Sequence, residues 1–434
     1  MSDFAIIGTG MAAFGASNYL KNVGIVPTLY DKRPYLGGHT ASHVVNDEWV
    51  FDEGPHISFT KNERIRDFLA ECVEDNFNEI SARVNNYWMG NWINHPVQTN
   101  LYGLDPALVT KIILEMSSLR ENSTEVVPKN YLEWLYSQFG ETFSNAFPVK
   151  YTKKYHTTDA RNLGVEWIGS RIYQPSLAEV VFGALAHDTP NNHYITKFRY
   201  PKKGGFSSYI QPIASSGNIR LNHEVVRIDH NSRYLYFKNG LRASYTKLIS
   251  SMPLPEIVAA LDDVPNNVYE ASAALACSRL LTVTIGIDRP NVHDAHWTYF
   301  YDEDIIFSRL STPHLQSNNN VPVGSSLLQA ECYFSNKYQP LNISPETCIS
   351  HVLKDLKRCG ILDDQETPSF THVLHTEYAN IIFDLDSATA TKIIHDYLDK
   401  IGIYYCGRYG DWAYHWTDQA FLSGEMAAEK SMLA

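Results

Sequence analysis

The sequence predicts an α/β protein built from several parts, and three observations support this fold class. Residues 4–60 alternate short apolar strands with a glycine-rich turn and a helix. Residues 105–195 have a mostly helical pattern, and residues 278–385 contain several short apolar runs of strand length. The 434 residues suffice for about two to four domains. We therefore expect a parallel sheet covered by helices, a helical insertion and an antiparallel sheet.

The composition excludes several classes of protein. Hydrophobic residues make up 44% of the chain and charged residues 19%, which is typical of a globular protein rather than a disordered chain or a coiled coil. The net charge of −12 disfavours a duplex nucleic-acid partner, which requires a basic surface. A few arginines can still form a local pocket for an anionic small molecule. The 27 Tyr and 8 Trp suit pockets where one ring edge packs and the other hydrogen-bonds.

Cysteine spacing and the N-terminal residues indicate the cellular compartment in which we expect the protein. The six cysteines are scattered, and no pair has the C-x-x-C spacing of zinc or thiol–disulfide sites, so we expect reduced thiols and no metal. No basic and apolar signal segment precedes Phe4, and no run reaches 18 apolar residues. We expect a cytoplasmic protein without a transmembrane segment. The oligomeric state is not determined by the sequence, and a homodimer is left open.

The first elements follow one another closely. Residues 4–7 predict a buried strand, residues 8–13 (Gly-Thr-Gly-Met-Ala-Ala) a turn, and the residues up to about Val23 a helix. A second strand is expected at Val26–Tyr30, and Asp31 follows it directly. The order strand, glycine-rich turn, helix, strand and acidic residue is that of a Rossmann-like unit.

Each position of this unit has a physical role in binding a dinucleotide. Gly8 permits the tight turn, and Gly10 lets the backbone approach a pyrophosphate. Ala13 is small enough for the helix and the strand to pack closely. The start of the helix offers unpaired N–H groups to phosphates, and Asp31, 21 residues after Gly10, is spaced to bind a ribose. This pattern alone does not distinguish NAD from FAD.

The next residues carry a resemblance to a known superfamily. Lys32 follows Asp31, Gly37-Gly38-His39 comes next, and residues 52–60 read Asp-Glu-Gly-Pro-His-Ile-Ser-Phe-Thr. The sequence here resembles the FAD superfamily of amine oxidases, protoporphyrinogen oxidases and UDP-galactopyranose mutases. Residues 52–60 look like the mutase segment Gly-(Pro/Ala)-His-Ile-Phe-His-Thr, which lies against the isoalloxazine ring. The resemblance implies FAD as the cofactor, with these residues near it: Lys32, Gly37, Gly38, His39 and His56.

Two positions depart from the mutase pattern in this region. Phe59 replaces the second histidine of the mutase segment, and His39 stands where the mutases have an asparagine. Both departures leave the flavin site in place and weaken the assignment of mutase chemistry.

The C-terminal residues resemble the last motif of the same superfamily. A short strand is expected at 403–406, followed by a Gly-Arg pair and a helix with small residues at 420, 423, 424, 427 and 428. These small residues predict a thin helix face that packs closely against its neighbour. The resemblance implies that Gly407, Arg408 and Asp411 adjoin the diphosphate or ribityl chain, and that Thr417 and Asp418 begin a helix near flavin O2.

The two halves of the expected flavin site lie at opposite ends of the chain, so the cofactor domain must be discontinuous. We expect an FAD-binding domain from residues 1–80, 200–260 and 395–434. Residues 81–199 are expected to form a mostly helical substrate or cap domain, and residues 261–394 an antiparallel-sheet substrate domain.

Shorter patterns place further elements. A helix is expected at 64–80, a hairpin at Asn85–Asn94 and a strand at Glu224–Asp229. In the superfamily, the last of these strands presents backbone groups to the adenine, so Val226 is the candidate for that contact.

Candidate substrate and catalytic residues come mainly from the resemblance. Arg309 lies where the mutases place an arginine on the nucleotide-sugar diphosphate, and Tyr378 lies where they use a tyrosine for the same group. Arg171 matches the first arginine of a mutase motif, whose second arginine is absent near Pro175. Tyr414 belongs to the aromatic C-terminal motif. His156 replaces a mutase tryptophan.

Two enzymatic interpretations are open. In the first, oxidised FAD accepts a hydride from a carbon that bears an amine or a hydroxyl, and His56 or His156 takes the proton, because histidine titrates near neutral pH. In the second, N5 of reduced FAD attacks an anomeric carbon and allows a redox-neutral pyranose–furanose exchange, with arginines on the leaving diphosphate. We expect an FAD-dependent oxidoreductase that acts on a polar small molecule, a nucleotide sugar or an amine. A UDP-sugar mutase is the alternative, and a non-catalytic flavin-binding protein is a third interpretation.

Overall fold

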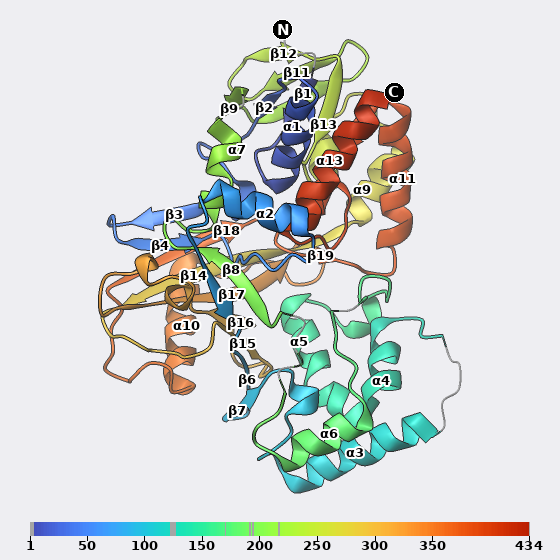
Figure 1. The fold of residues 1–434 in the computed structure, drawn as a ribbon. Coiled ribbons are helices and arrows are strands. Elements are labelled where there is room, and N and C mark those ends of the chain that lie inside the picture. Colours follow the sequence, from blue (N-terminus) through green and yellow to red (C-terminus); the bar gives the residue numbers. More distant parts are fainter. Residues whose placement is uncertain are drawn as a thin grey trace.

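The computed structural model describes residues 4–121, 127–169, 171–190, 192, 195–215 and 218–433. Its first sheet is parallel and has the strand order β20-β13-β1-β2-β9 (Figure 1). The strands are β1 (Phe4–Ile7), β2 (Thr28–Tyr30), β9 (Asn218–Arg220), β13 (Lys247–Ser250) and β20 (Ile403–Tyr405). They come from the N-terminal, middle and C-terminal parts of the chain, as expected for a discontinuous domain.

Helices cover both faces of this sheet, which is why β1 is buried along its whole length. On one face lie α1 (Met11–Asn22) and α13 (Thr417–Leu433), and α2 (Glu63–Cys72) lies beside them. On the other face lie α8 (Leu254–Ala260), α9 (Asn266–Ala274) and α11 (Ser387–Lys400). Alternate residues of β1 point to the two faces, so that Ile6 packs under α1 and Ile7 packs toward α8.

The crossing of α1 and α13 depends on small residues, as the sequence predicts. Gly424 lies against the backbone of α1, and a Cβ atom there would collide with the carbonyl oxygen of Ala12. Ala427 and Ala428 are buried on the same face. This close contact brings the C-terminal helix onto the N-terminal glycine-rich turn.

A second sheet has the strand order β18-β14-β17-β16-β15-β6-β7, with β19 (Ile381–Ile382) paired to β14. Its other strands are β6 (Val84–Trp88), β7 (Asn91–Asn94), β14 (Ala276–Ile287), β15 (Trp297–Phe300), β16 (Arg309–Ser311), β17 (Ser326–Ser335) and β18 (Phe370–Thr376). All pairs are antiparallel except β15 with β6. The predicted hairpin at 85–94 is therefore present, and it belongs to this sheet rather than to the helical part. α10 (Pro345–Arg358) packs on the sheet.

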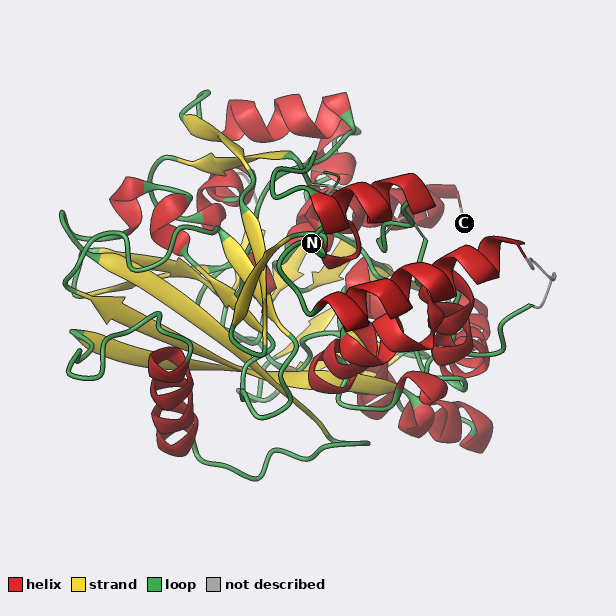
Figure 2. Ribbon diagram, turned by 90° about the horizontal axis from the view of Figure 1, so that it is seen from below, coloured by secondary structure: helices red, strands yellow, loops and turns green. Residues whose placement is uncertain are grey.

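The helical part contains α3 (Pro106–Glu121), α4 (Tyr131–Ala146), α5 (Pro148–Tyr155) and α6 (Leu177–Leu185). Figure 2 shows these helices gathered beside the long strands of the second sheet. They have their own apolar core, which includes Phe139 and Phe143. α5 ends at the second sheet, where Tyr155 contacts the ring of Tyr333 with centroids 4.8 Å apart.

One expected helix is shorter than the sequence predicts. The helix expected at 64–80 ends at Cys72, because Glu74 and Asp75 adopt positive φ angles of 50° and 57°. The chain then enters β5 (Phe77–Ser81), which pairs with β8 (Lys197–Pro201). Apolar residues keep a helix-like spacing beyond Cys72, so the spacing alone does not reveal the turn at Glu74 and Asp75.

The remaining elements are short. The antiparallel strands are β3 (Ser42–Val45) with β4 (Trp49–Asp52), and β10 (Val225–Asp229) with β11 (Tyr234–Phe237) and β12 (Arg242–Ser244). The short helices are η1 (Gly38–Thr40), η2 (Val97–Thr99), η3 (Ala160–Asn162), η4 (Phe206–Tyr209), α7 (Gln211–Ser215), η5 (Pro313–Leu315), η6 (Asn318–Asn320) and α12 (Gly407–Gly410). Among the helices in the described ranges, none has the length and apolar character needed to cross a bilayer.

Candidate functional site

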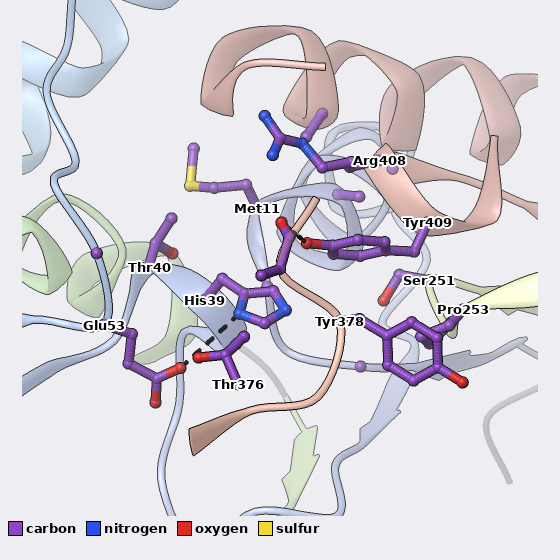
Figure 3. A pocket seen from close by; sticks show the side chains of 18 of the residues that line it. Met11, His39, Thr40, Glu53, Ser251, Pro253, Thr376, Tyr378, Arg408 and Tyr409 are labelled. Carbon is purple, nitrogen blue, oxygen red and sulfur yellow. Dashed lines mark hydrogen bonds and ion pairs between the residues drawn. The ribbon is translucent and has the colours of Figure 1, made fainter. Parts of the chain in front are cut away.

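A cavity of about 740 Å³ runs between the parallel sheet and the second sheet. Its lining comes from the N-terminal turn, from the middle of the chain and from the C-terminal motif. Most residues that the sequence analysis singles out lie on its wall: Gly8, Gly10, Asp31, Lys32, Gly37, Gly38, His39, His56, Val226, Arg309, Tyr378, Gly407, Arg408, Tyr414 and Thr417. Figure 3 shows part of this wall, where His39, Tyr378, Arg408 and Tyr409 lie around one space.

The glycine-rich turn presents backbone to the cavity. Gly8 has a φ of 111°, and a Cβ there would collide with the hydroxyl of Ser251. Gly10 is the N-cap of α1, and within the described residues no side chain caps that helix. The first N–H groups of α1 therefore remain for a ligand, and the helix dipole favours an anion there. Gly38 faces Gly10 across the cavity wall, where a Cβ on Gly38 would lie 3.2 Å from the Gly10 Cα.

Asp31 is held at the end of β2 by three hydrogen bonds. Its Oδ2 accepts from the backbone N–H of Thr9 at 2.9 Å and from the Thr9 hydroxyl at 2.6 Å, and its Oδ1 accepts from the N–H of Arg33 at 2.8 Å. The carboxylate is thus tied to the turn that carries the helix start. The sequence analysis gave Thr9 no role, although a hydroxyl between two glycines of the turn is the signal for this bond.

An ion pair that the sequence analysis missed fixes the Gly37–Gly38 loop. Arg33 donates from Nη1 to Glu53 Oε2 at 2.7 Å and to the Gly38 carbonyl at 3.0 Å. Tyr35 also donates to Glu53, at 2.8 Å. Burial alone would raise the pKa of Glu53, but the hydrogen bond from His43 and the charge of Arg33 outweigh it and lower this pKa to about 2. The carboxylate is therefore ionised at neutral pH and holds the loop in place.

Both candidate histidines near the cavity centre are neutral at pH 7. Burial, together with the charge of Arg33, lowers the pKa of His39 to about 3, although Glu53 lies 3.9 Å from its Nδ1 (Figure 3). Burial also lowers the pKa of His56 to about 4. His56 Nδ1 lies 2.9 Å from the carbonyl of Gly54, so this nitrogen carries the proton of the neutral ring.

The C-terminal motif places a cation on the cavity wall. Arg408 follows Gly407 and donates from Nε to the His415 carbonyl at 2.9 Å and from Nη1 to Asn380 Oδ1 at 3.2 Å. Thr417, at the start of α13, also lines the cavity. Two helix N-termini, those of α1 and α13, therefore face the same space and make it favourable for negative charge.

One part of the cavity is a polar chamber with aromatic walls. Arg309 on β16 forms a two-pronged ion pair with Glu331 on β17, from Nε to Oε2 at 2.7 Å and from Nη2 to Oε1 at 2.8 Å. The two residues are register partners on neighbouring strands. Tyr333 donates to Glu331 at 3.0 Å, and the hydroxyls of Tyr155 and Tyr414 lie 3.0 Å apart. The sequence analysis did not predict Glu331, which balances the charge of the predicted arginine.

Three predicted cofactor residues do not line the cavity. Ala13 is fully buried beneath the turn, consistent with a packing role. Asp418 lies in the first turn of α13 and is half-buried. Asp411 accepts hydrogen bonds from the Ser423 hydroxyl and from His415 Nε2. Their expected roles beside a cofactor stay predictions.

One predicted substrate-binding residue, Arg171, and one predicted catalytic residue, His156, also lie behind the wall. Arg171 donates to the carbonyls of Trp167 and Tyr414, at 2.9 and 2.7 Å, and its guanidinium lies over the Tyr414 ring. It therefore supports Tyr414 from behind. His156 is 4% exposed and packs against Tyr155, and burial lowers its pKa to about 4. His156 follows the last residue of α5, and this position directs it into the helical core rather than the chamber.

The donor set fits a flavin adenine dinucleotide. The uncapped start of α1, the gap between two glycine loops and Asp31 suit a pyrophosphate and a ribose. Val226, 48% exposed on β10, also lines the cavity. The same cavity includes the polar chamber, whose lining is aromatic and charged.

Comparisons with known proteins agree with this arrangement. Residues 6–72 match the family model described as an NAD(P)-binding Rossmann-like domain. A structure of reduced UDP-galactopyranose mutase has a TM-score of 0.93 and 22% sequence identity, and the match covers 100% of this chain and 96% of that one. A putative protoporphyrinogen oxidase from Exiguobacterium sp. has a TM-score of 0.76 at 15% identity, covering 99% of both chains. A putrescine oxidase variant has a TM-score of 0.65 at 14% identity, covering 100% of this chain and 99% of that one.

The fold and the cavity define an α/β protein with a Rossmann-like domain. The predicted resemblance to the superfamily of amine oxidases, protoporphyrinogen oxidases and UDP-galactopyranose mutases is confirmed at the level of the fold.

Proposed function

We propose that this chain binds FAD and is a flavoenzyme that acts on a polar small molecule. The observation that carries the proposal is one continuous cavity, lined both by the glycine-rich turn and by the polar chamber. When bound, FAD supplies a ring that accepts or donates electrons. The protein residues then bind the cofactor, orient the substrate and exclude water.

Residues from both chain ends hold the cofactor in this proposal. The N–H groups at the start of α1 and the guanidinium of Arg408 balance the charge of the diphosphate. Asp31 accepts from a ribose hydroxyl, and the backbone beside Val226 contacts the adenine. His39, Gly37 and Gly38 close the wall next to the ribityl chain.

The chamber residues orient the substrate. The Arg309–Glu331 pair offers both charges to a polar group, and Tyr155 and Tyr414 offer hydroxyls beside it. His56 lines the cavity as a neutral ring whose Nε2 can accept a hydrogen bond from a substrate amine or hydroxyl. An oxidoreductase that acts on an amine or a hydroxyl of a polar molecule is therefore the first candidate.

A redox-neutral UDP-sugar mutase is the second candidate, and the shape of the whole chain favours it. The TM-score with the reduced mutase is 0.93, against 0.76 and 0.65 for the two oxidases. Arg309 and Tyr378 also lie on the cavity wall, as a role on a nucleotide-sugar diphosphate requires. Against it, Glu331 balances the charge of Arg309.

The first experiment tests cofactor binding. The purified native protein is expected to bind FAD and to show a flavin absorption spectrum. Gly10→Val is expected to lower FAD affinity at least tenfold, because its side chain enters the gap beside Gly37 and Gly38. Gly24→Asn is the control, since a side chain there meets no atom within 4 Å and Asn tolerates its positive φ. A native protein that cannot be reconstituted with FAD would refute the proposal.

The second experiment separates the two candidates. The oxidase candidate predicts that a panel of amines, amino sugars and alcohols includes one that bleaches the oxidised flavin or consumes oxygen. The mutase candidate predicts that dithionite-reduced protein converts UDP-galactopyranose to the furanose form. Furanose product without flavin bleaching by the panel would favour the mutase, and the reverse result would favour the oxidoreductase.

A further inference from the structure

A histidine that the proposed function leaves without a role lies on the cavity wall. His415 lines the cavity one residue after Tyr414, just before α13 begins. Its Nε2 lies 2.8 Å from Oδ2 of Asp411, which does not line the cavity. The imidazole therefore separates a carboxylate from the cavity, as in histidines that exchange protons beside a bound molecule.

The surrounding hydrogen bonds determine which nitrogen of His415 carries the proton. The backbone N–H of Gly407 donates to the Ser423 hydroxyl oxygen at 2.8 Å, so that this hydroxyl must give its own proton to Asp411 Oδ2. Asp411 thus accepts from Ser423 and from His415. An ionised carboxylate is acceptor-only, so Nε2 of His415 is the donor and Nδ1 is the atom that gains a proton.

The charges around His415 favour a change of its protonation when the cavity gains negative charge. In the described residues, the charged and titratable groups on the elements packed around it include Asp411, Arg408, Tyr409, Tyr414, Tyr155, Arg171, Asp418 and His395. Arg408 and Arg171 bind the carbonyls of His415 and Tyr414, and Asp411 is the anion in direct contact with the ring. A negative charge added in the cavity would therefore stabilise an imidazolium at His415 together with Asp411.

We propose that His415 takes up one proton at Nδ1 when FAD bound in this cavity is reduced. This inference rests on the proposed function. Reduction by two electrons, from a substrate or from dithionite, adds one proton to the flavin and leaves one negative charge on its ring at neutral pH. A second proton moves from solvent to Nδ1, and Asp411 stays ionised beside the imidazolium. Protein and cofactor together then take up two electrons and two protons.

The pH dependence of the reduction potential of the holoprotein tests this proton count. The native holoprotein is expected to take up two protons per two electrons over the pH range around neutrality. His415→Gln is expected to take up one proton fewer over the same range. His395→Gln is the matched control, because His395 contacts the neighbouring Gly410 carbonyl from α11 and lies off the cavity wall.

Nitrogen NMR of histidine-labelled native holoprotein gives a second readout that needs no stable variant. A histidine is expected to carry a proton on Nε2 alone in the oxidised form and on both nitrogens after dithionite reduction at the same pH. Asp411→Ala removes the acceptor of the Nε2 proton, and should move the neutral ring to the Nδ1–H form.

The outcomes distinguish this inference from the proposed function. If His415→Gln keeps the native proton count, or if no histidine changes protonation on reduction, the inference is wrong while FAD binding stands. A native protein without FAD affinity would overturn the proposed function and this inference together.

Discussion

At the scale of single residues, the site depends on buried charges that neutralise one another. Glu53 holds Arg33 beside the glycine loop, and Glu331 holds Arg309 in the chamber. Removing one partner of such a pair leaves an uncompensated charge away from water, which is more costly than losing a surface ion pair. The two pairs therefore set both the rigidity and the electrostatic character of the cavity.

The Arg309–Glu331 pair predicts how the chamber responds to anions. Glu331→Gln leaves the guanidinium of Arg309, which is half-buried in the cavity wall, without its counter-charge, so the free energy of unfolding should fall by about 2 kcal/mol. The same change should strengthen UDP binding several-fold, because the freed guanidinium can pair with a diphosphate. Calorimetric titration with UDP and urea unfolding measure the two effects. Glu303→Gln, which removes the partner of exposed Lys153, is the control and should change neither quantity.

The low pKa of Glu53 predicts a pH-dependent stability. Since the folded-state pKa of about 2 lies below the ordinary value of 4.5, ionised Glu53 stabilises the folded protein above pH 4.5, and this contribution is lost as the pH falls toward 2. Glu53→Gln should lower the free energy of unfolding by about 3 kcal/mol at pH 7. Urea unfolding at a series of pH values should show this difference shrinking below pH 4.5. A difference that is constant with pH would contradict the assigned pKa.

At the scale of elements, the close crossing of α1 and α13 joins the two halves of the site. Both helices begin at the cavity, and small side chains let their backbones approach. A change in this crossing would therefore move both helix N-termini relative to a bound diphosphate. The stability of the packing and the affinity for the cofactor should change together.

Gly424→Val tests this coupling. The new side chain collides with the backbone of Ala12 and Ala16, so the free energy of unfolding should fall by about 3 kcal/mol and FAD affinity should also fall. Thermal unfolding and FAD titration measure the two effects. Met426→Val introduces the same residue at a position of α13 that is 61% exposed. This change should lower the free energy of unfolding by less than about 1 kcal/mol and leave FAD affinity unchanged. Loss of stability without loss of affinity would show that the helix starts are positioned independently.

At the scale of the whole molecule, the cavity lies where the separate sheets meet. Its wall includes residues of β1, of β16 and β17, and of the C-terminal motif, which are hundreds of residues apart in sequence. A ligand that fills the cavity contacts all of these parts only in the folded state. Ligand binding should therefore stabilise the whole chain.

FAD is expected to raise the free energy of unfolding by about 3 kcal/mol at a concentration of 100 times its Kd. FMN lacks the adenosine half and should stabilise the protein less, because it leaves the region of Asp31 and Val226 without contacts. Differential scanning calorimetry of the apoprotein with each flavin measures this. Equal stabilisation by both flavins at equal free concentration would contradict binding of the adenosine half at β2 and β10.

Local sequence patterns were sufficient for the parts of the fold whose contacts are close in the chain. The turn at 8–13, the strand before it and the helix after it follow from glycine conformation and apolar spacing. The same reasoning failed at 73–80, where a turn with positive φ angles interrupts a spacing that still looks helical. Periodicity reports a buried face, and it does not report where the chain reverses.

The sequence by itself predicted the Rossmann-like unit, which depends on short motifs with strict local geometry, and the resemblance to the FAD superfamily predicted the return of the C-terminal motif to that unit. Only the tertiary structure decided what the predicted side chains contact. Arg309 is balanced by Glu331 because β16 and β17 pair in that register, and His156 lies behind Tyr155 because α5 ends there. Such pairings depend on strand register and helix orientation, which are set by packing across the whole chain rather than by neighbouring residues.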